Sequence, residues 1–351
     1  MATCKDRPAS SPTSLRHLLQ ETDTFVTCVE LVTTRGTMAD RSGQKLLELA
    51  QALAENSSID GLSITDNPGG NAMIGTDALA YDLRSRGGEV VIHLSCKDLN
   101  RNGLQSRAWQ LASEGFCNIL TLSGDYPIAG YEGVASPVFD IDSVGLLEIL
   151  STMNRGLETV GRKGKTARMQ KTEFFLGAVV NNHKVLESEV MPQYFKLAKK
   201  IACGAEFIIN QIGYDARKQD ELLKYMSANG LSVPVIGNVY ALNGPVARVF
   251  NSCRIPGVVV SDDLLAIAEK QAASQDKGKA FFIELAAKQC AIHRGLGYRG
   301  IYIGGNLKYE DYESILELER SYGTDDWKQF ATEIQFSRPR EFYYFGTENP
   351  V

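Results

Sequence analysis

Several short apolar runs of this chain end on residues that can exchange protons or form hydrogen bonds. The run 119–122 is followed by Ser123, Gly124 and Asp125, a turn-forming segment that carries a carboxylate. Burying such groups without a partner costs about 1–3 kcal/mol each, so buried strands seldom end on them repeatedly. The polar residues at the ends of the successive runs are Glu30, Thr65, His93, Ser123 with Asp125, Asn181, Gln211 and Asn238. As a set, they predict a shared functional site.

The residue types in this set suit proton transfer and ligand orientation. It holds two acids, one histidine and several amides, without a nucleophile–base pair or a metal-binding cluster. Enzymes with such sites usually take a cofactor for the most difficult step. Each residue also has an ordinary alternative: His93 as a hydrogen-bonded core histidine, Asp125 as a turn residue and Gln211 as a helix cap.

The apolar runs alternate with segments of helical periodicity, and this alternation predicts the elements that hold the polar set. The predicted strands are 24–31, 59–65, 89–95, 117–123, 173–180, 206–212, 233–239 and 299–305. Such alternation indicates a parallel sheet covered on both faces. Eight units predict an α/β fold, the (β/α)8 TIM barrel, whose active sites lie at the C-terminal strand ends. A doubly wound sheet is the alternative, but no GxGxxG follows the first run.

Three regions depart from the regular alternation. Residues 151–170 are basic and rich in glycine, so we expect an exposed loop before the fifth strand. The segment 240–298 is long enough for extra helices before the last strand, and the aromatic tail is expected to dock on the barrel. We expect one domain over 1–351, with a loose N-terminal lead-in at 1–22 and a C-terminal extension at 306–351.

Composition narrows the classes of partner. The net charge of −5 with no basic stripe argues against nucleic acid. The seven cysteines are scattered, without a CxxC pair, which favours reduced thiols over a zinc site. No run approaches the roughly 18 apolar residues of a membrane span, and the polar start has no secretory pattern. We therefore expect a cytoplasmic protein.

Four motifs in the same order resemble the methylenetetrahydrofolate reductase family over about residues 25–305. They are CVELVTTRG, LSITDNPGG, IHLSC and KKIACGAEFIINQ, and the segment LSGD lies between the last two. Long runs such as SPVFDIDSVGLLEIL and VPVIGNVY are similar to the branch of acetogenic and anaerobic one-carbon pathways. The resemblance implies a (β/α)8 barrel that binds a flavin and exchanges hydride between NAD(P)H and 5,10-methylenetetrahydrofolate.

The resemblance also implies roles for individual residues. Glu30 would protonate N10 of the folate, and Asp125 would bind the pterin and influence the flavin. Gln211 and Tyr214 would contact the folate. The residues implied in flavin binding are Thr65, His93, Ser123, Gly124, Phe139, Asp142 and Lys200. Ser123 stands where the family commonly has an arginine that can pair with phosphate, which leaves FMN or a weakly held flavin open beside FAD.

We therefore expect a flavin-dependent oxidoreductase that interconverts 5,10-methylenetetrahydrofolate and 5-methyltetrahydrofolate with NAD(P)H. The alternative is a tetrahydrofolate-dependent methyltransferase, a demethylase component that uses the same pocket without flavin. A third possibility is a non-catalytic subunit of a one-carbon complex. The expected partners are small molecules, a separate zinc-binding or corrinoid-related subunit, and further copies of the chain in a homo-oligomer.

Overall fold

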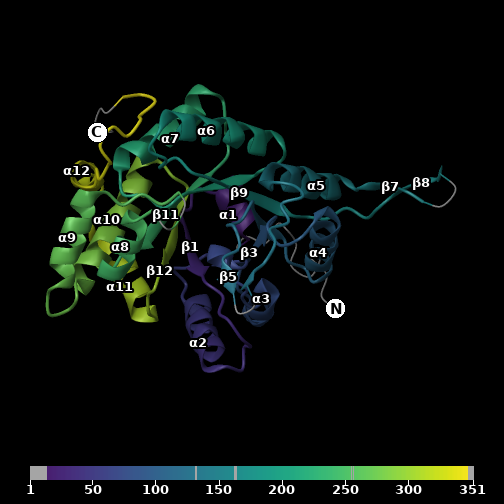
Figure 1. Cartoon of the computed structure of the whole chain (residues 1–351), viewed down its shortest axis with the longest axis horizontal. Coiled ribbons are helices and arrows are strands. Elements are labelled where there is room, and N and C mark those ends of the chain that lie inside the picture. Colours follow the sequence, from purple (N-terminus) through teal and green to yellow (C-terminus); the bar gives the residue numbers. More distant parts are fainter. Residues whose placement is uncertain (1–13, 131–132, 162–163, 254, 256, 347–351) are drawn as a thin grey trace.

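The chain folds around a closed barrel of eight parallel strands, shown in Figure 1. The structure is a computed structural model, and it describes residues 14–130, 133–161, 164–253, 255 and 257–346. Around the barrel the strands follow the order β1-β12-β11-β10-β9-β4-β3-β2. Their bounds are β1 Val26–Leu31, β2 Gly61–Ile64, β3 Val90–Ser95, β4 Asn118–Leu122, β9 Phe175–Val180, β10 Phe207–Asn210, β11 Val235–Ala241 and β12 Gly300–Gly305. The predicted (β/α)8 barrel and all eight of its strands are confirmed.

Alternate residues of each strand point into the barrel, because the side-chain period of a strand is two. The lower interior is filled by apolar side chains that include Val26, Cys28, Leu120 and Phe207. Intervening residues such as Val29 and Ile64 belong to the larger core between the sheet and the helices. Continued to the C-terminal ends of the strands, the inward set reaches the polar residues that the sequence singled out.

Helices surround the barrel, each with an apolar stripe toward the sheet (Figure 1). In α2 this stripe consists of Leu46, Ala50 and Leu53, spaced four and three residues apart. The bounds are α2 Arg41–Glu55, α3 Thr76–Ser85, α4 Arg101–Ser113, α5 Ser143–Arg155, α6 Glu187–Ala202, α7 Ala216–Ala228, α8 Gly244–Asn251, α9 Asp262–Ala272, α10 Lys279–Leu296, α11 Tyr309–Ser321 and α12 Asp326–Glu333. Three of them, α8, α9 and α10, lie between β11 and β12, which confirms the extra helices before the last strand.

Two expectations about local structure need correction. Part of the predicted exposed loop 151–170 belongs to α5, and an antiparallel hairpin follows, formed by β7 Glu158–Val160 and β8 Thr166–Arg168. The hairpin projects along the long axis of the molecule (Figure 1). Within the stretch expected to be a loose lead-in, Leu15–Glu21 forms helix α1. Leu15 and Leu19 of α1 are buried in the cluster at the lower end of the barrel, and this burial explains why the segment is helical.

The segment after α12 docks on the barrel, as expected. The Phe336 amide donates to the Tyr214 carbonyl at 2.9 Å, and the Phe342 amide donates to the Val185 carbonyl at 2.9 Å. Arg217 donates to the Tyr343 hydroxyl at 3.0 Å and lies over the same ring. The tail is therefore held at the ends of β9 and β10 by backbone and side-chain contacts.

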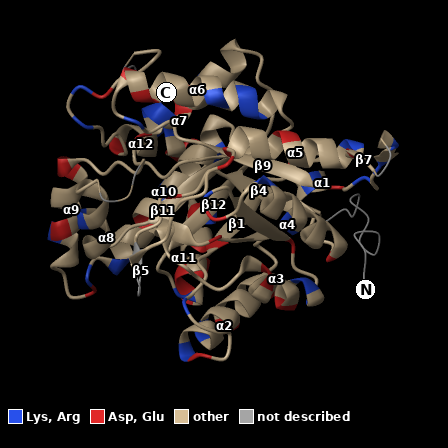
Figure 2. Cartoon of the chain, turned by 45° about the vertical axis from the view of Figure 1, so that its right-hand side comes forward, with Lys and Arg blue, Asp and Glu red and all other residues tan. Residues whose placement is uncertain are grey.

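Both signs of charge occur over the outer helices, where Lys and Arg are interspersed with Asp and Glu (Figure 2). None of the helices in the described ranges is long and apolar enough to cross a membrane. Free thiols are found at Cys28, Cys96, Cys203, Cys253 and Cys290, whereas Cys117 is disulfide-bonded and departs from the expectation.

Two buried histidines that do not line the cavity pack against glycines. The His183 ring covers Gly213 and the His293 ring covers Gly237, and neither glycine has room for a Cβ atom. Burial lowers the pKa of His183 to about 4 and that of His293 to about 3, from an ordinary value of 6.5. Both rings are therefore neutral in the folded protein near neutral pH.

These histidines should make the fold sensitive to acid. Between pH 6.5 and about 4 the unfolded chain binds protons that the folded chain does not, so stability is complete above pH 6.5 and is lost as the pH falls. The free energy of unfolding, measured by urea denaturation, should drop by up to about 1.4 kcal/mol per pH unit for each histidine. His293→Gln should reduce this slope. An unchanged slope in His293→Gln would contradict the assignment.

Candidate functional site

A cavity of about 270 Å³ opens at the C-terminal ends of the barrel strands. Its walls separate into a side with ionisable groups and a side with amides. The ionisable residues that line it are Glu30, Asp66, His93, Lys97, Asp125 and Tyr302. The amide residues that line it are Asn181, Gln193, Asn210, Gln211 and Asn238. This is the end at which (β/α)8 barrels carry their active sites.

Glu30 lies at the end of β1 and belongs to a chain of hydrogen bonds inside the barrel. The Tyr302 hydroxyl donates to Glu30 Oε2 at 3.0 Å and lies 3.3 Å from His93 Nε2. Ser63 Oγ lies 2.8 Å from the same nitrogen. Burial raises the pKa of Glu30, while the hydrogen bond from Tyr302 acts against this rise. Glu30 therefore holds a proton more tightly than an exposed glutamate does.

His93 is both a cavity residue and a hydrogen-bonded interior histidine. Its ring bonds to Ser63 and Tyr302, and burial lowers its pKa to about 3. The imidazole is thus neutral near pH 7. The ordinary alternative for this residue is partly correct, since His93 has partners in the core as well as a place in the cavity wall.

Asp66 and Lys97 form a second charged group at the ends of β2 and β3. Asp66 Oδ2 accepts hydrogen bonds from the Ser95 amide at 3.0 Å and from Ser95 Oγ at 2.7 Å. Burial raises the pKa of Asp66, against the opposing effect of those bonds. The Lys97 ammonium pairs with Asp98, and its aliphatic stem covers Gly124. Lys97 is therefore a cation that already has a carboxylate partner.

Asp125 lies at the rim and helps join two loops. Its Oδ2 accepts the Gly69 amide at 3.0 Å, and Gly70 O accepts the Ile128 amide at 3.1 Å. Gly70 also packs so closely against the Tyr126 carbonyl that a Cβ atom would collide with it. Asp125 therefore anchors the β2–α3 loop, which is a structural role. It also lines the rim of the cavity, where its carboxylate can contact a ligand.

The amide side of the cavity retains one buried donor without a partner. Asn210 Oδ1 accepts the Asn238 amide at 2.7 Å, whereas Asn210 Nδ2 has no hydrogen-bond partner among the described residues. Gln211 Oε1 accepts the Ile212 amide at 2.9 Å, and Asn181 donates to the Gly257 carbonyl at 2.9 Å. A ligand with an acceptor facing Asn210 would satisfy that donor.

Six of the eleven site residues predicted from the sequence line the cavity: Glu30, Thr65, His93, Gly124, Asp125 and Gln211. The structure does not bring the other five to its wall. Ser123 bonds to Ser143 at 3.2 Å, Phe139 packs on Tyr126, and Tyr214 donates to the Tyr240 carbonyl at 2.9 Å. The remaining two, Asp142 and Lys200, are considered next.

Asp142 and Lys200 take part in structural contacts near α5 and α6. Asp142 caps α5 through the Val144 and Gly145 amides and pairs with Lys196 at 2.8 Å. Burial acts to raise the pKa of Asp142, but the Lys196 and backbone contacts lower it below the ordinary value. Lys200 donates to the Val179 carbonyl at 2.5 Å, and burial lowers its pKa to about 8. Both side chains therefore have partners within the protein, and neither residue lines the cavity.

The sequence reasoning missed several further residues that line the cavity, among them Asp66, Lys97, Asn210 and Tyr302. Tyr302 could have been found from the period of two, since it alternates with Gly300 and Gly304 on β12. Asp66 directly follows Thr65, and Lys97 lies two residues after the end of the predicted strand 89–95. The prediction took one or two polar residues at each strand end and so left out these neighbouring residues.

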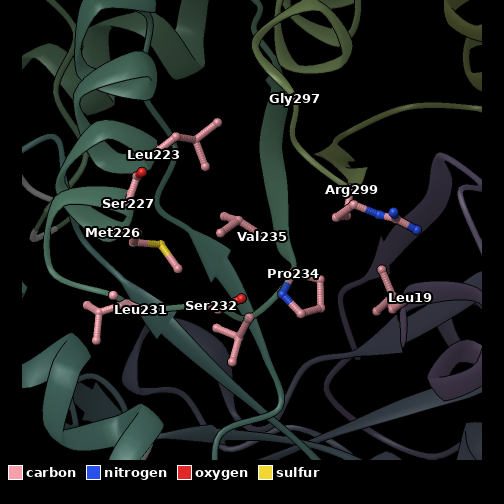
Figure 3. A pocket seen from close by; sticks show the side chains of 12 residues that line it. Leu19, Leu223, Met226, Ser227, Leu231, Ser232, Pro234, Val235, Gly297 and Arg299 are labelled. Carbon is pink, nitrogen blue, oxygen red and sulfur yellow. The ribbon is translucent and has the colours of Figure 1, made fainter. Parts of the chain in front are cut away.

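A larger hollow of about 550 Å³ lies at the opposite end of the barrel, beside β11 and α7 (Figure 3). Its walls are mainly apolar and include Leu19, Met226 and Pro234. The one charged residue in its lining, Arg299, donates to the Leu18 carbonyl at 3.3 Å and pairs with Asp23 at 3.5 Å. This end of a (β/α)8 barrel usually serves stability. The cavity at the C-terminal strand ends is therefore the candidate site.

The packing of the β2–α3 loop against the segment after β4 should depend more on Gly70 than on Gly69. Both glycines have left-handed backbone, with φ of +72° and +64°, so alanine strains each by roughly 1 kcal/mol. Only at Gly70 would the new Cβ collide with the Tyr126 backbone, whereas at Gly69 the nearest atom is 3.5 Å away. Gly70→Ala should lower the melting temperature clearly more than Gly69→Ala does. Equal losses, measured by circular dichroism, would show that the loops are not packed in this way.

Two solved structures can be aligned with most of this chain. In the structural search, an uncharacterized protein from Clostridium thermocellum, described as binding two copies of 5-methyl-5,6,7,8-tetrahydrofolic acid, aligns with a TM-score of 0.57 and 14% identity. That alignment covers 85% of this chain and 95% of the other. Oxaloacetate acetylhydrolase aligns with a TM-score of 0.45 and 12% identity, over 84% of this chain and 80% of that enzyme. The likeness to the Clostridium thermocellum protein concerns the fold alone.

The sequence itself carries the family assignment. No curated protein sequence matches the chain. The family model described as methylenetetrahydrofolate reductase matches residues 15–297, a range that begins at α1 and includes seven strands of the barrel. The chain therefore belongs to the methylenetetrahydrofolate reductase family.

Proposed function

We propose that this protein binds tetrahydrofolate in the cavity and interconverts its 5,10-methylene and 5-methyl forms, with Glu30 as the acid and NAD(P)H as the source or acceptor of the hydride. The observation that carries the proposal is a half-buried glutamate in the cavity wall with a raised pKa and no Lys or Arg paired with it among the described residues. Membership of the reductase family supports the substrate class. The Clostridium thermocellum neighbour, which binds 5-methyltetrahydrofolic acid, agrees with this choice.

In this proposal Glu30 opens the five-membered ring of the methylene form. The proton moves from Glu30 to N10 as the N10–methylene bond breaks, and the nitrogen lone pair of N5 forms an iminium bond with the same carbon. Burial raises the pKa of Glu30, which favours the protonated carboxyl that this step requires. In the reverse direction the ionised Glu30 takes the proton back.

The amide wall and Asp125 would orient the folate. A pterin ring presents adjacent donors and acceptors, which Asn210, Gln211 and Asn238 can match with amide groups. Asp125 at the rim can accept from the pterin amino group while it keeps the Gly69 amide on one oxygen. Thr65 is occupied by contacts with Thr33 and Leu31, so we assign it a structural role at the cavity edge.

A flavin with a diphosphate does not fit the described residues well. Ser123 has no charge and is bonded to Ser143, and the Lys200 ammonium is bonded to a carbonyl. Lys97, the basic residue in the cavity wall, is paired with Asp98 and adjoins Asp66. An anionic phosphate would therefore meet carboxylates rather than free cations. We derive no step of the reaction through a flavin.

Glu30→Gln should lower interconversion of the two folate forms by about 10²-fold or more, the usual effect of losing a general acid. Glutamine keeps the size of the side chain and can still accept from Tyr302, so binding of 5-methyltetrahydrofolate, measured by calorimetry, should change little. Glu48→Gln on the exposed face of α2 is the matched control. Chromatographic separation of the folates, with flavin and NAD(P)H supplied, measures the rate. A wild-type rate in Glu30→Gln would make Glu30 structural.

The second candidate is a folate protein that works without flavin and transfers the methyl group. The observation that favours it is that Ser123, Asp142 and Lys200 are bonded within the protein and lie outside the cavity wall. A separate one-carbon subunit would then receive or supply the methyl group, and further copies of the chain could assemble with it.

A visible spectrum of the purified protein should distinguish the two candidates. If the second is correct, the protein shows no flavin bands, and added FAD or FMN does not change the fluorescence of the flavin. Ser123→Arg should then create flavin affinity only if the phosphates reach that position. Tight flavin in the wild-type protein, together with NAD(P)H oxidation, would support the reductase and exclude the flavin-free candidate.

A further inference from the structure

Tyr302 occupies the inside of β12 directly beside Glu30. Its side chain is only 2% exposed, and its hydroxyl is 3.0 Å from Glu30 Oε2 and 3.3 Å from His93 Nε2. The ring packs with the apolar interior of the barrel, which includes Leu120 and Phe207. The hydroxyl is thus placed by a rigid strand and a packed ring rather than by a loop.

We propose that Tyr302 is a positioning residue for Glu30, whose hydroxyl orients the carboxyl and couples its protonation to the hydrogen bonding of His93. The inference rests on the proposed function for the role of Glu30 as an acid. The geometry itself, a hydroxyl between a carboxyl and an imidazole, does not depend on the identity of the substrate.

The surroundings of Glu30 leave this hydroxyl as its main partner. The titratable groups near it are Tyr302 from β12, Tyr240 from β11 and Tyr312 from α11, with His93 reached through Tyr302. Of these, Tyr302 makes the hydrogen bond to Glu30 in the described structure. Gly304 gives the carboxyl its space, since a Cβ there would come within 3.2 Å of Glu30 Oε1.

The hydroxyl can reverse its hydrogen bond when Glu30 gains a proton. With ionised Glu30, Tyr302 donates to the carboxylate and Ser63 can donate to His93 Nε2. With protonated Glu30, the carboxyl donates to Tyr302, whose own proton can turn to His93 Nε2. The distances of 2.8 Å from Ser63 and 3.3 Å from Tyr302 to that nitrogen permit both arrangements. His93 remains neutral in both, because burial lowers its pKa to about 3.

The test is Tyr302→Phe, which keeps the packed ring and removes the hydroxyl. Without the donor to its ionised form, Glu30 should stay protonated to a pH about one unit higher. Infrared titration of the protonated carboxyl band measures this directly, and the band is assigned by its loss in Glu30→Gln. Tyr312→Phe, which removes a nearby hydroxyl with no bond to Glu30, is the matched control and should leave the titration unchanged. Circular dichroism verifies that each variant is folded.

A kinetic measurement adds a second readout. In Tyr302→Phe, kcat should fall about 10-fold or more with little change in KM for the folate, because the acid is misplaced while the substrate site is intact. The alkaline limb of the kcat–pH profile should move to higher pH together with the midpoint of the infrared titration. An unchanged infrared titration would overturn the proposal. If Glu30→Gln left turnover unaffected while the infrared shift appeared, the proposed function would fail and the positioning by Tyr302 would stand.

Discussion

The constraint on which the rest of the structure depends is the closure of eight parallel strands into one barrel. Closure sends alternate residues inward, and parallel direction brings all eight C-terminal ends to the same opening. Val26 and Cys28 fill the interior, and Glu30, two residues further along the same face, reaches the cavity. On β12, the same period of two places Gly300, Tyr302 and Gly304 on one face of the strand. One geometric rule therefore supplies both the apolar core and the polar site.

The cavity has one wall with ionisable side chains and another with uncharged amide side chains. On one side, desolvation raises the pKa of Glu30 and of Asp66, and hydrogen bonds from neighbouring groups oppose this rise. On the other side, amides provide donors and acceptors without charge. A charged phosphate would gain little here, whereas a neutral heterocycle with several nitrogen atoms would find partners. The chemistry of the walls therefore suits the pterin ring of a folate better than the phosphates of a dinucleotide.

The rim is held by contacts that depend on small residues and a carboxylate. Gly69 donates to Asp125, and Gly70 permits close contact with Tyr126. In the segment DNPGG, these glycines let two loops approach each other closely. A binding residue at this rim is therefore also part of the scaffold, and its structural and functional effects have to be separated by matched variants.

The sequence by itself determined the barrel, its eight strands, the extra helices before β12 and the family. Those features depend on local periodicity and on motifs, which a linear chain displays. It also identified Glu30, His93 and Asp125 as strand-end residues. Only the tertiary structure decided that Ser123 turns to α5 and that Tyr302 meets Glu30, because hydrogen-bond partners 20 and 272 residues apart are chosen by packing across the barrel. The hairpin 158–168 and helix α1 were missed for the same reason: their conformation depends on contacts and burial that hydropathy periodicity does not record.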